Sequence, residues 1–110
     1  MSLVEQDQYA AVDRLLRTLY ATREKMDDNA PDGYTARVRI HVPGEEIEPY
    51  AAQLLPPWLF FEHDDEDGRR RVVGVRPEQI LRVDVRFVSS TEREAPGFHI
   101  RAPEEEPLGA

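Results

Sequence analysis

The chain contains no cysteine among its 110 residues, and Lys25 is the single lysine among 14 basic residues. Without cysteine there is no disulfide, no thiolate nucleophile and no cysteine-ligated zinc, which is compatible with a cytoplasmic location. One lysine leaves very little room for a catalytic amine. No stretch approaches the roughly 18 apolar residues that a transmembrane helix needs, and no basic segment leads into an apolar stretch as in a signal peptide. We therefore predict a cytoplasmic protein with no membrane partner.

Sequence motifs of common enzyme classes are also missing. We find no Walker A loop, no G-x-G-x-x-G, no G-x-S-x-G and no H-E-x-x-H. The three histidines are far apart in the sequence, which gives no sign of a metal site, and we predict no metal or cofactor. A net charge of −8 makes nucleic acid an improbable partner. The sequence favours a non-catalytic protein, although a site assembled from distant residues would leave no motif.

The composition is that of a globular protein, with 40% hydrophobic and 33% charged residues. A chain of this length can bury one core, so we predict a single domain over residues 1–101. Residues 102–110 are acidic and contain proline, and we expect a flexible tail there. Tyr9, Val12, Leu16 and Leu19 recur at helical spacing, which predicts an amphipathic helix over residues 3–26.

The middle of the chain alternates between apolar and polar residues, as β-strands do. Leu81, Val83, Val85 and Phe87 are separated by polar residues, which indicates one buried and one solvated face. Asp67-Gly68 is a hairpin-turn pair. The patterns predict strands over about 34–42, 57–63, 70–76 and 80–88, with an edge strand over 97–101. Residues 47–55 fit either a short helix or a strand, and the helix propensity of the Ala and Leu residues there favours a short helix.

The predicted fold class is therefore α+β: an N-terminal amphipathic helix packed on an antiparallel sheet of four to five strands. An alternative comes from the order of the elements, which is a helix, a strand, a glycine turn, a connector and then three strands. This order resembles that of Sm-like and SH3-like small β-barrels. The resemblance is one of pattern, carries no motif residues, and implies a barrel with an N-terminal helix.

Arginines on two of the predicted strands form the first candidate site. Arg37 and Arg39 share one face of the strand over 34–42, and Arg82 and Arg86 share one face of the strand over 80–88. If these strands are neighbours, the four guanidinium groups gather on one sheet surface and could bind a phosphate or carboxylate ligand. The alternative is a solvated face whose arginines are balanced by nearby acidic residues.

The second candidate site is the aromatic segment Trp58, Phe60 and Phe61. Apolar side chains on both faces of one strand need cover on both sides, and a homodimer could supply it. Alternatively, residues 47–55 cover one face within the same chain.

The acidic segment His63–Asp67 before Gly68 could be considered for calcium, but the downstream glutamate of a calcium loop is absent, which favours a solvated turn. Together these features predict a small non-catalytic interaction or accessory domain that self-associates or binds a protein partner. An anion-binding or small enzymatic domain that uses the arginine face is the alternative.

Overall fold

The computed structural model describes residues 3–89 and 97–109. It begins with the helix α1 (Leu3–Asp28), which confirms the predicted helix and extends it by two residues. Val12, Leu16 and Leu19 form its buried stripe. At its C-terminal end the side chain of Asn29 donates a hydrogen bond of 2.8 Å to the carbonyl oxygen of Lys25, and Pro31 follows in the loop. The helix thus ends where a side chain satisfies a free carbonyl and a proline cannot extend the ladder.

Seven strands in the described residues form two sheets. Sheet A has the order β2-β1-β6 and sheet B the order β5-β4-β3-β7. All pairs are antiparallel except β3 with β7. The strands are β1 (Tyr34–Val42), β2 (Glu45–Ile47), β3 (Ala51–Leu55), β4 (Trp58–Asp64), β5 (Arg70–Val75), β6 (Arg82–Ser89) and β7 (His99–Arg101), with a 3₁₀ turn η1 (Pro77–Gln79) before β6.

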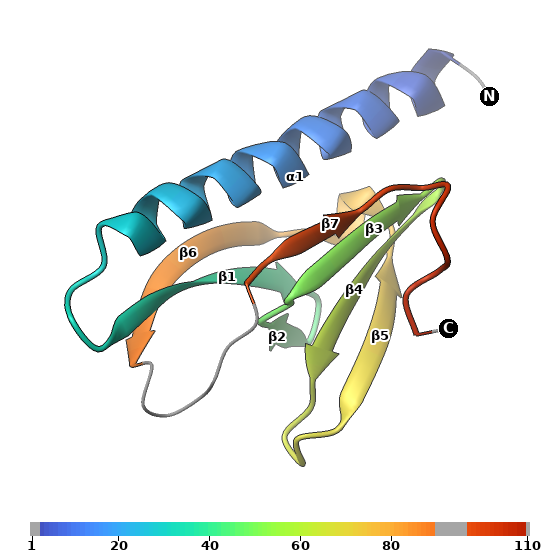
Figure 1. Ribbon diagram of the computed structural model, residues 1–110. Helices are drawn as coiled ribbons and strands as arrows, with labels where there is room; N and C mark the ends of the chain where they lie inside the picture. Colours follow the sequence, from blue (N-terminus) through green and yellow to red (C-terminus); the bar gives the residue numbers. More distant parts are fainter. Residues whose placement is uncertain (1–2, 90–96, 110) are drawn as a thin grey trace.

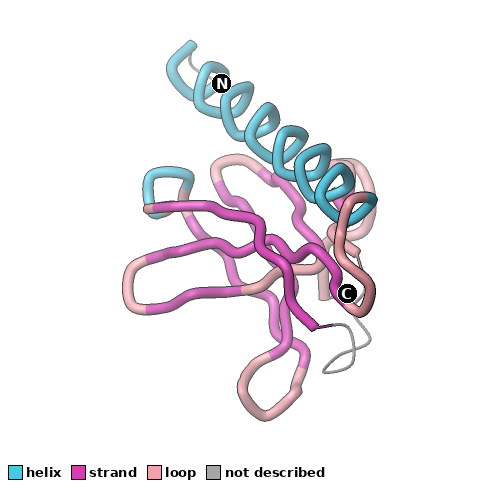
Figure 2. The backbone as a smooth tube through the Cα atoms, turned by 90° about the vertical axis from the view of Figure 1, so that its left-hand side faces the viewer, coloured by secondary structure: helices cyan, strands magenta, loops and turns pink. Residues whose placement is uncertain are grey.

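The α+β prediction is confirmed, since one helix packs on predominantly antiparallel sheets. The alternative of a small closed barrel is wrong. In the described part of the chain, β2 and β6 are the edge strands of one sheet and β5 and β7 those of the other. No strand pairing in this part joins these edges, so the two sheets stay open. Viewed at right angles to Figure 1, α1 lies to one side of the strands (Figure 2).

The core lies where α1 meets both sheets. Its members come from α1, from the inward faces of β1, β3 and β4, and from Ile47, Val75 and Phe98. Phe61, Leu16, Ile40 and Leu59 are among its largest fully buried side chains. Because Val38 and Ile40 face this core, the alternating residues Arg37, Arg39 and His41 lie on the face of sheet A turned away from α1.

The segment over 47–55 corrects one prediction. It contains no helix: β2 ends at Ile47 and β3 runs over Ala51–Leu55 in the interior of sheet B. Four of the five residues of β3 are buried, because β4 and β7 flank it and other parts of the chain cover both of its faces. The edge strand predicted over 97–101 is present as β7, but it runs parallel to its neighbour.

Residues 102–109, predicted as a flexible tail, lie against β3 in the structure. The fully buried Gln53 side chain donates to the carbonyl oxygen of Ala102 at 3.0 Å, and its Oε1 accepts a hydrogen bond from the backbone N–H of Leu108 at 3.0 Å. No helix in the described ranges is both long and apolar enough to cross a membrane.

Candidate functional site

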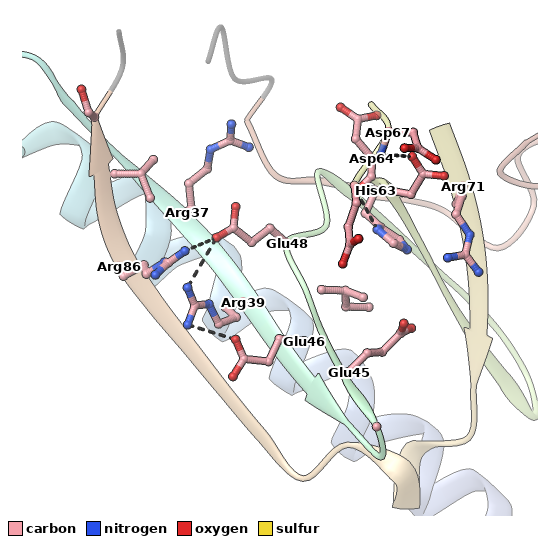
Figure 3. Close-up of a pocket in the computed structure, with 16 residues that line it drawn as sticks. Arg37, Arg39, Glu45, Glu46, Glu48, His63, Asp64, Asp67, Arg71 and Arg86 are labelled. Carbon is pink, nitrogen blue, oxygen red and sulfur yellow. Dashed lines mark hydrogen bonds and ion pairs between the residues drawn. The ribbon is translucent and has the colours of Figure 1, made fainter. Parts of the chain in front are cut away.

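A cleft of about 840 Å³ lies between the outer face of sheet A and the far end of the β4–β5 hairpin (Figure 3). Charged side chains from both sheets line it. The acidic ones outnumber the basic ones, seven to four: Glu45, Glu46, Glu48, Asp64, Asp65, Glu66 and Asp67 against Arg37, Arg39, Arg71 and Arg86.

The sheet A wall of the cleft is a network of ion pairs. Arg39 contacts the carboxylates of Glu46 at 3.3 Å and Glu48 at 3.7 Å. Arg86, on the neighbouring strand, also bonds Glu48, so this carboxylate joins two guanidinium groups (Figure 3). Arg37 lies on the same wall and is buried, with a relative exposure of 7%. Charge on this wall is therefore largely balanced within the wall itself.

The arginine face predicted from the sequence does form, because β1 and β6 are neighbours. Their register places Arg37 opposite Arg86, and Arg82 opposite His41. However, Arg82 contacts Asp84 at 3.7 Å and does not line the cleft. The structure therefore brings Arg37, Arg39 and Arg86 to one cleft and leaves Arg82 beside it. Arg39, Arg82 and Arg86 each contact a carboxylate.

The opposite wall is the turn of the β4–β5 hairpin. The Asp65 side chain accepts hydrogen bonds from the backbone N–H groups of Asp67 at 3.0 Å and Arg69 at 2.9 Å. Gly68 has φ of 78°, a left-handed conformation that glycine adopts without strain. Asp65 thus shapes the turn. Glu66 and Asp67 are exposed and line the cleft, and neither forms an ion pair with a described residue.

Tyr50 supports this hairpin from behind. Its hydroxyl donates to the Asp64 carboxylate at 3.3 Å and accepts a hydrogen bond from Arg70 at 3.0 Å. Burial of the ring raises the pKa of the Tyr50 hydroxyl, which keeps it a donor at neutral pH. His63 is also buried, with a relative exposure of 6%, and its Nδ1 lies 3.1 Å from the Asp64 carbonyl oxygen.

The three aromatic residues proposed as an interface lie in different surroundings. Phe61 is fully buried in the core, so it offers no surface to a partner. Phe60 lies opposite Gly74 in the register of β4 and β5. Trp58 is 42% exposed, and the guanidinium of Arg76 lies 5.6 Å from its ring centroid. One face of β4, with Leu59 and Phe61, is therefore buried in the core, whereas the other face, with Trp58 and Phe60, stays partly exposed.

The sequence did not point to the acidic half of the cleft as part of a site. The sequence patterns predict a short helix over 47–55, which includes Glu48, and a solvated turn for the acidic hairpin. The glutamates over 45–48 are visible in the sequence. Only the pairing of the strands, however, shows which of these carboxylates reach Arg39. Within the described residues, no three His, Asp or Glu side chains converge to hold a metal ion.

The fold and the cleft together define an α+β protein with one helix on two open sheets and a charged cleft between them. No family model, no curated protein and no solved structure matches this chain.

Proposed function

We propose that the protein is a small non-catalytic interaction module whose cleft binds a basic segment of a partner protein. The observation that carries this proposal is the surplus of carboxylates over guanidinium groups in the cleft, seven against four. Arg39 and Arg86 are engaged by Glu46 and Glu48, so the surplus lies on the hairpin wall. A ligand with lysine or arginine side chains would meet carboxylates that have no cation of their own.

The lining of the cleft favours a polypeptide segment over a small apolar ligand. Small-molecule pockets are lined predominantly by hydrophobic and aromatic side chains. Here Ile47 and Val88 are the apolar members of a lining that is otherwise charged or polar, apart from Gly44. An anion at the arginine face would have to displace Glu48 from Arg39 and Arg86, which makes anion binding the weaker alternative. Self-association and a cytoplasmic location, both predicted from the sequence, remain predictions that the cleft does not bear on.

A titration with a short poly-lysine peptide, followed by NMR amide shifts, tests the proposal. We expect shifts at His63, Arg71 and Glu46, and weaker binding as salt is raised. Replacing Glu66 and Asp67 together by Gln and Asn removes two unpaired carboxylates and keeps the turn, because the Asp65 side chain is retained. This double variant should bind several-fold more weakly.

The matched control replaces Asp7 and Glu104, exposed acids that do not line the cleft, by Asn and Gln. This control carries the same change of net charge. Equal weakening in both variants would show that peptide binding follows overall charge and would refute binding in the cleft. Binding of a poly-glutamate peptide at the arginine face would instead support the anion-binding alternative.

A further inference from the structure

The strand β6 is the longest sheet edge in the described part of the chain. The edges of sheet A are β2, with three residues, and β6, with eight; those of sheet B are β5, with six, and β7, with three. An uncovered edge presents backbone N–H and C=O groups that can pair with another strand. In Figure 1, β6 forms the outer side of its sheet.

The side chains of β6 leave an incompletely covered apolar row beside α1. Val83 and Val85 pack against the core and are half-buried. At the ends of the same row, Leu81 is 68% exposed and Phe87 is 41% exposed. β5, by comparison, is two residues shorter and contains Gly74, which weakens a strand.

We infer that two copies of this chain associate through β6, paired antiparallel about a two-fold axis at Val85. In an antiparallel pair, residues directly opposite one another face the same side, so the axis can fall only on a residue of the strand and not between two residues. The pairing would join the two three-stranded sheets into one six-stranded sheet, with both helices on the same side.

The charges on β6 select the axis. With the axis at Val85, Asp84 of each copy lies opposite Arg86 of the other, which gives two pairs of opposite charge. An axis at Asp84 would place two carboxylates opposite each other, and an axis at Arg86 two guanidinium groups. Like charges directly opposite are destabilising.

An axis at Val83 also pairs opposite charges, but it overlaps the two strands only over 82–84. The Val85 axis overlaps 82–88 and places Val83 opposite Phe87 of the second copy on the apolar side. Cross-strand pairs of aromatic and β-branched residues stabilise sheets. The exposed Phe87 ring would thereby be covered.

Single cysteines test the axis, because the chain has none of its own. Val85→Cys places two thiols directly opposite each other, at a separation that a disulfide spans. On oxidation, Val85→Cys should give a covalent dimer, whereas Val83→Cys, opposite Phe87, should not. Thr18→Cys, exposed on α1, controls for random collision. A dimer from Val83→Cys in place of Val85→Cys would refute the Val85 axis.

Charge reversal tests the pairing without a covalent bond. Asp84→Arg and Arg86→Asp each place like charges opposite each other in the homodimer, and each should raise the dimer Kd about tenfold. Mixed in equal amounts, the two variants restore both opposite-charge pairs, so the mixture should dimerise about as well as the native chain. Circular dichroism and Tm confirm that each variant is folded.

Sedimentation equilibrium of the native chain decides whether association occurs at all. A monomer at the highest soluble concentration would overturn the inference. The β6 contact and the cleft share Arg86 and Val88, so poly-lysine binding is measured separately. A monomeric chain that still binds poly-lysine would leave the proposed function standing.

Discussion

Asp27 joins the last turn of α1 to the start of β1 through two hydrogen bonds. Its carboxylate accepts from the Thr35 hydroxyl at 2.7 Å and from the backbone N–H of Ala36 at 2.9 Å. These bonds lower the pKa of Asp27, with the backbone bond from Ala36 as the largest cause, followed by the bond from Thr35. At the scale of single residues, this contact ties the end of the helix to the first strand of sheet A.

Replacing Asp27 by Ala should lower the free energy of unfolding by about 1 kcal/mol at neutral pH, a modest value because the carboxylate is partly exposed. The folded-state pKa is below the unfolded value of about 3.9, so the stabilisation is fully present above that value. It is lost as pH falls through the lower folded-state pKa. Urea unfolding of both proteins across pH 2–7, on the order of one pH unit per step, measures this.

Asp28→Ala is the matched control, because Asp28 is exposed and its side chain makes no hydrogen bond or ion pair with the described residues. It should leave stability nearly unchanged. A difference between Asp27→Ala and the native chain that stays constant down to the lowest pH would contradict the role of the ionised carboxylate.

Gln53 is the residue that holds the C-terminal segment in place. Its amide nitrogen lies within hydrogen-bond distance of the carbonyl oxygens of Ala102, Glu105 and Glu106, at 3.0, 3.3 and 3.4 Å. Its oxygen accepts from the N–H of Leu108. A fully buried side chain therefore supplies most of the polar contacts between β3 and residues 102–109.

Gln53→Met keeps the length of the side chain and removes these bonds, at a cost of about 1–3 kcal/mol from unsatisfied groups. We expect residues 102–109 to detach before the rest of the fold unfolds. Limited proteolysis followed by mass spectrometry should show cleavage there about tenfold faster. Gln8→Met, on the exposed face of α1, serves as the control, and equal cleavage of both variants would argue against this role of Gln53.

At the scale of elements, Phe60 and Gly74 form a matched pair across β4 and β5. A Cβ atom added to Gly74 would lie 2.8 Å from Cε1 of Phe60, closer than van der Waals contact. The ring therefore occupies the space that a side chain on β5 would need, as aromatic residues do opposite glycines in antiparallel sheets.

Gly74→Ala should destabilise the hairpin by about 1–2 kcal/mol, because it displaces the ring. In a Phe60→Leu background the same substitution should be neutral or stabilising, since alanine suits a strand better than glycine does. Thermal unfolding of the four proteins gives the coupling between the two sites. Strictly additive effects would show that the ring does not occupy this space.

Strand β3 shows where pattern reading from the sequence fails. The strands β1, β4, β5 and β6 were predictable because alternation or a flanking hairpin turn marks them, as at Val83 and Val85 or at Asp67-Gly68. β3 is buried on both faces, so Ala51–Leu55 carries no period of two and its Ala and Leu residues favour a helix. Pairing with β4 and β7 overrides that propensity.

The candidate site was predictable only in part, for a related reason. Arg37, Arg39 and Arg86 could be placed on one face from alternation alone. Which carboxylates they meet depends on the β1–β2 turn and on the position of sheet B, neither of which follows from local sequence. The ion pairs of Arg39 with Glu46 and Glu48 therefore appear only in the structure.

At the scale of the whole molecule, the net charge of −8 opposes self-association and favours binding of a basic peptide. Two copies with this charge repel one another, and the repulsion extends about 30 Å at 0.01 M salt but about 8 Å at 0.15 M. The two Asp84–Arg86 pairs of the dimer are local, and each contributes only about 0.2–1 kcal/mol. The long-range repulsion is therefore the larger salt-dependent contribution to self-association.

The two associations should consequently respond differently to salt. Between about 0.01 and 0.15 M salt, the dimer should tighten several-fold as repulsion is screened, while poly-lysine binding in the cleft should weaken. Sedimentation equilibrium measures the first response and a peptide titration the second, on the same preparation. A dimer that weakens with salt would mean that charge pairs, rather than backbone pairing and the apolar row of Val83, Val85 and Phe87, carry the contact. Peptide binding that is unaffected by salt would mean that the carboxylates of the hairpin wall do not hold the ligand.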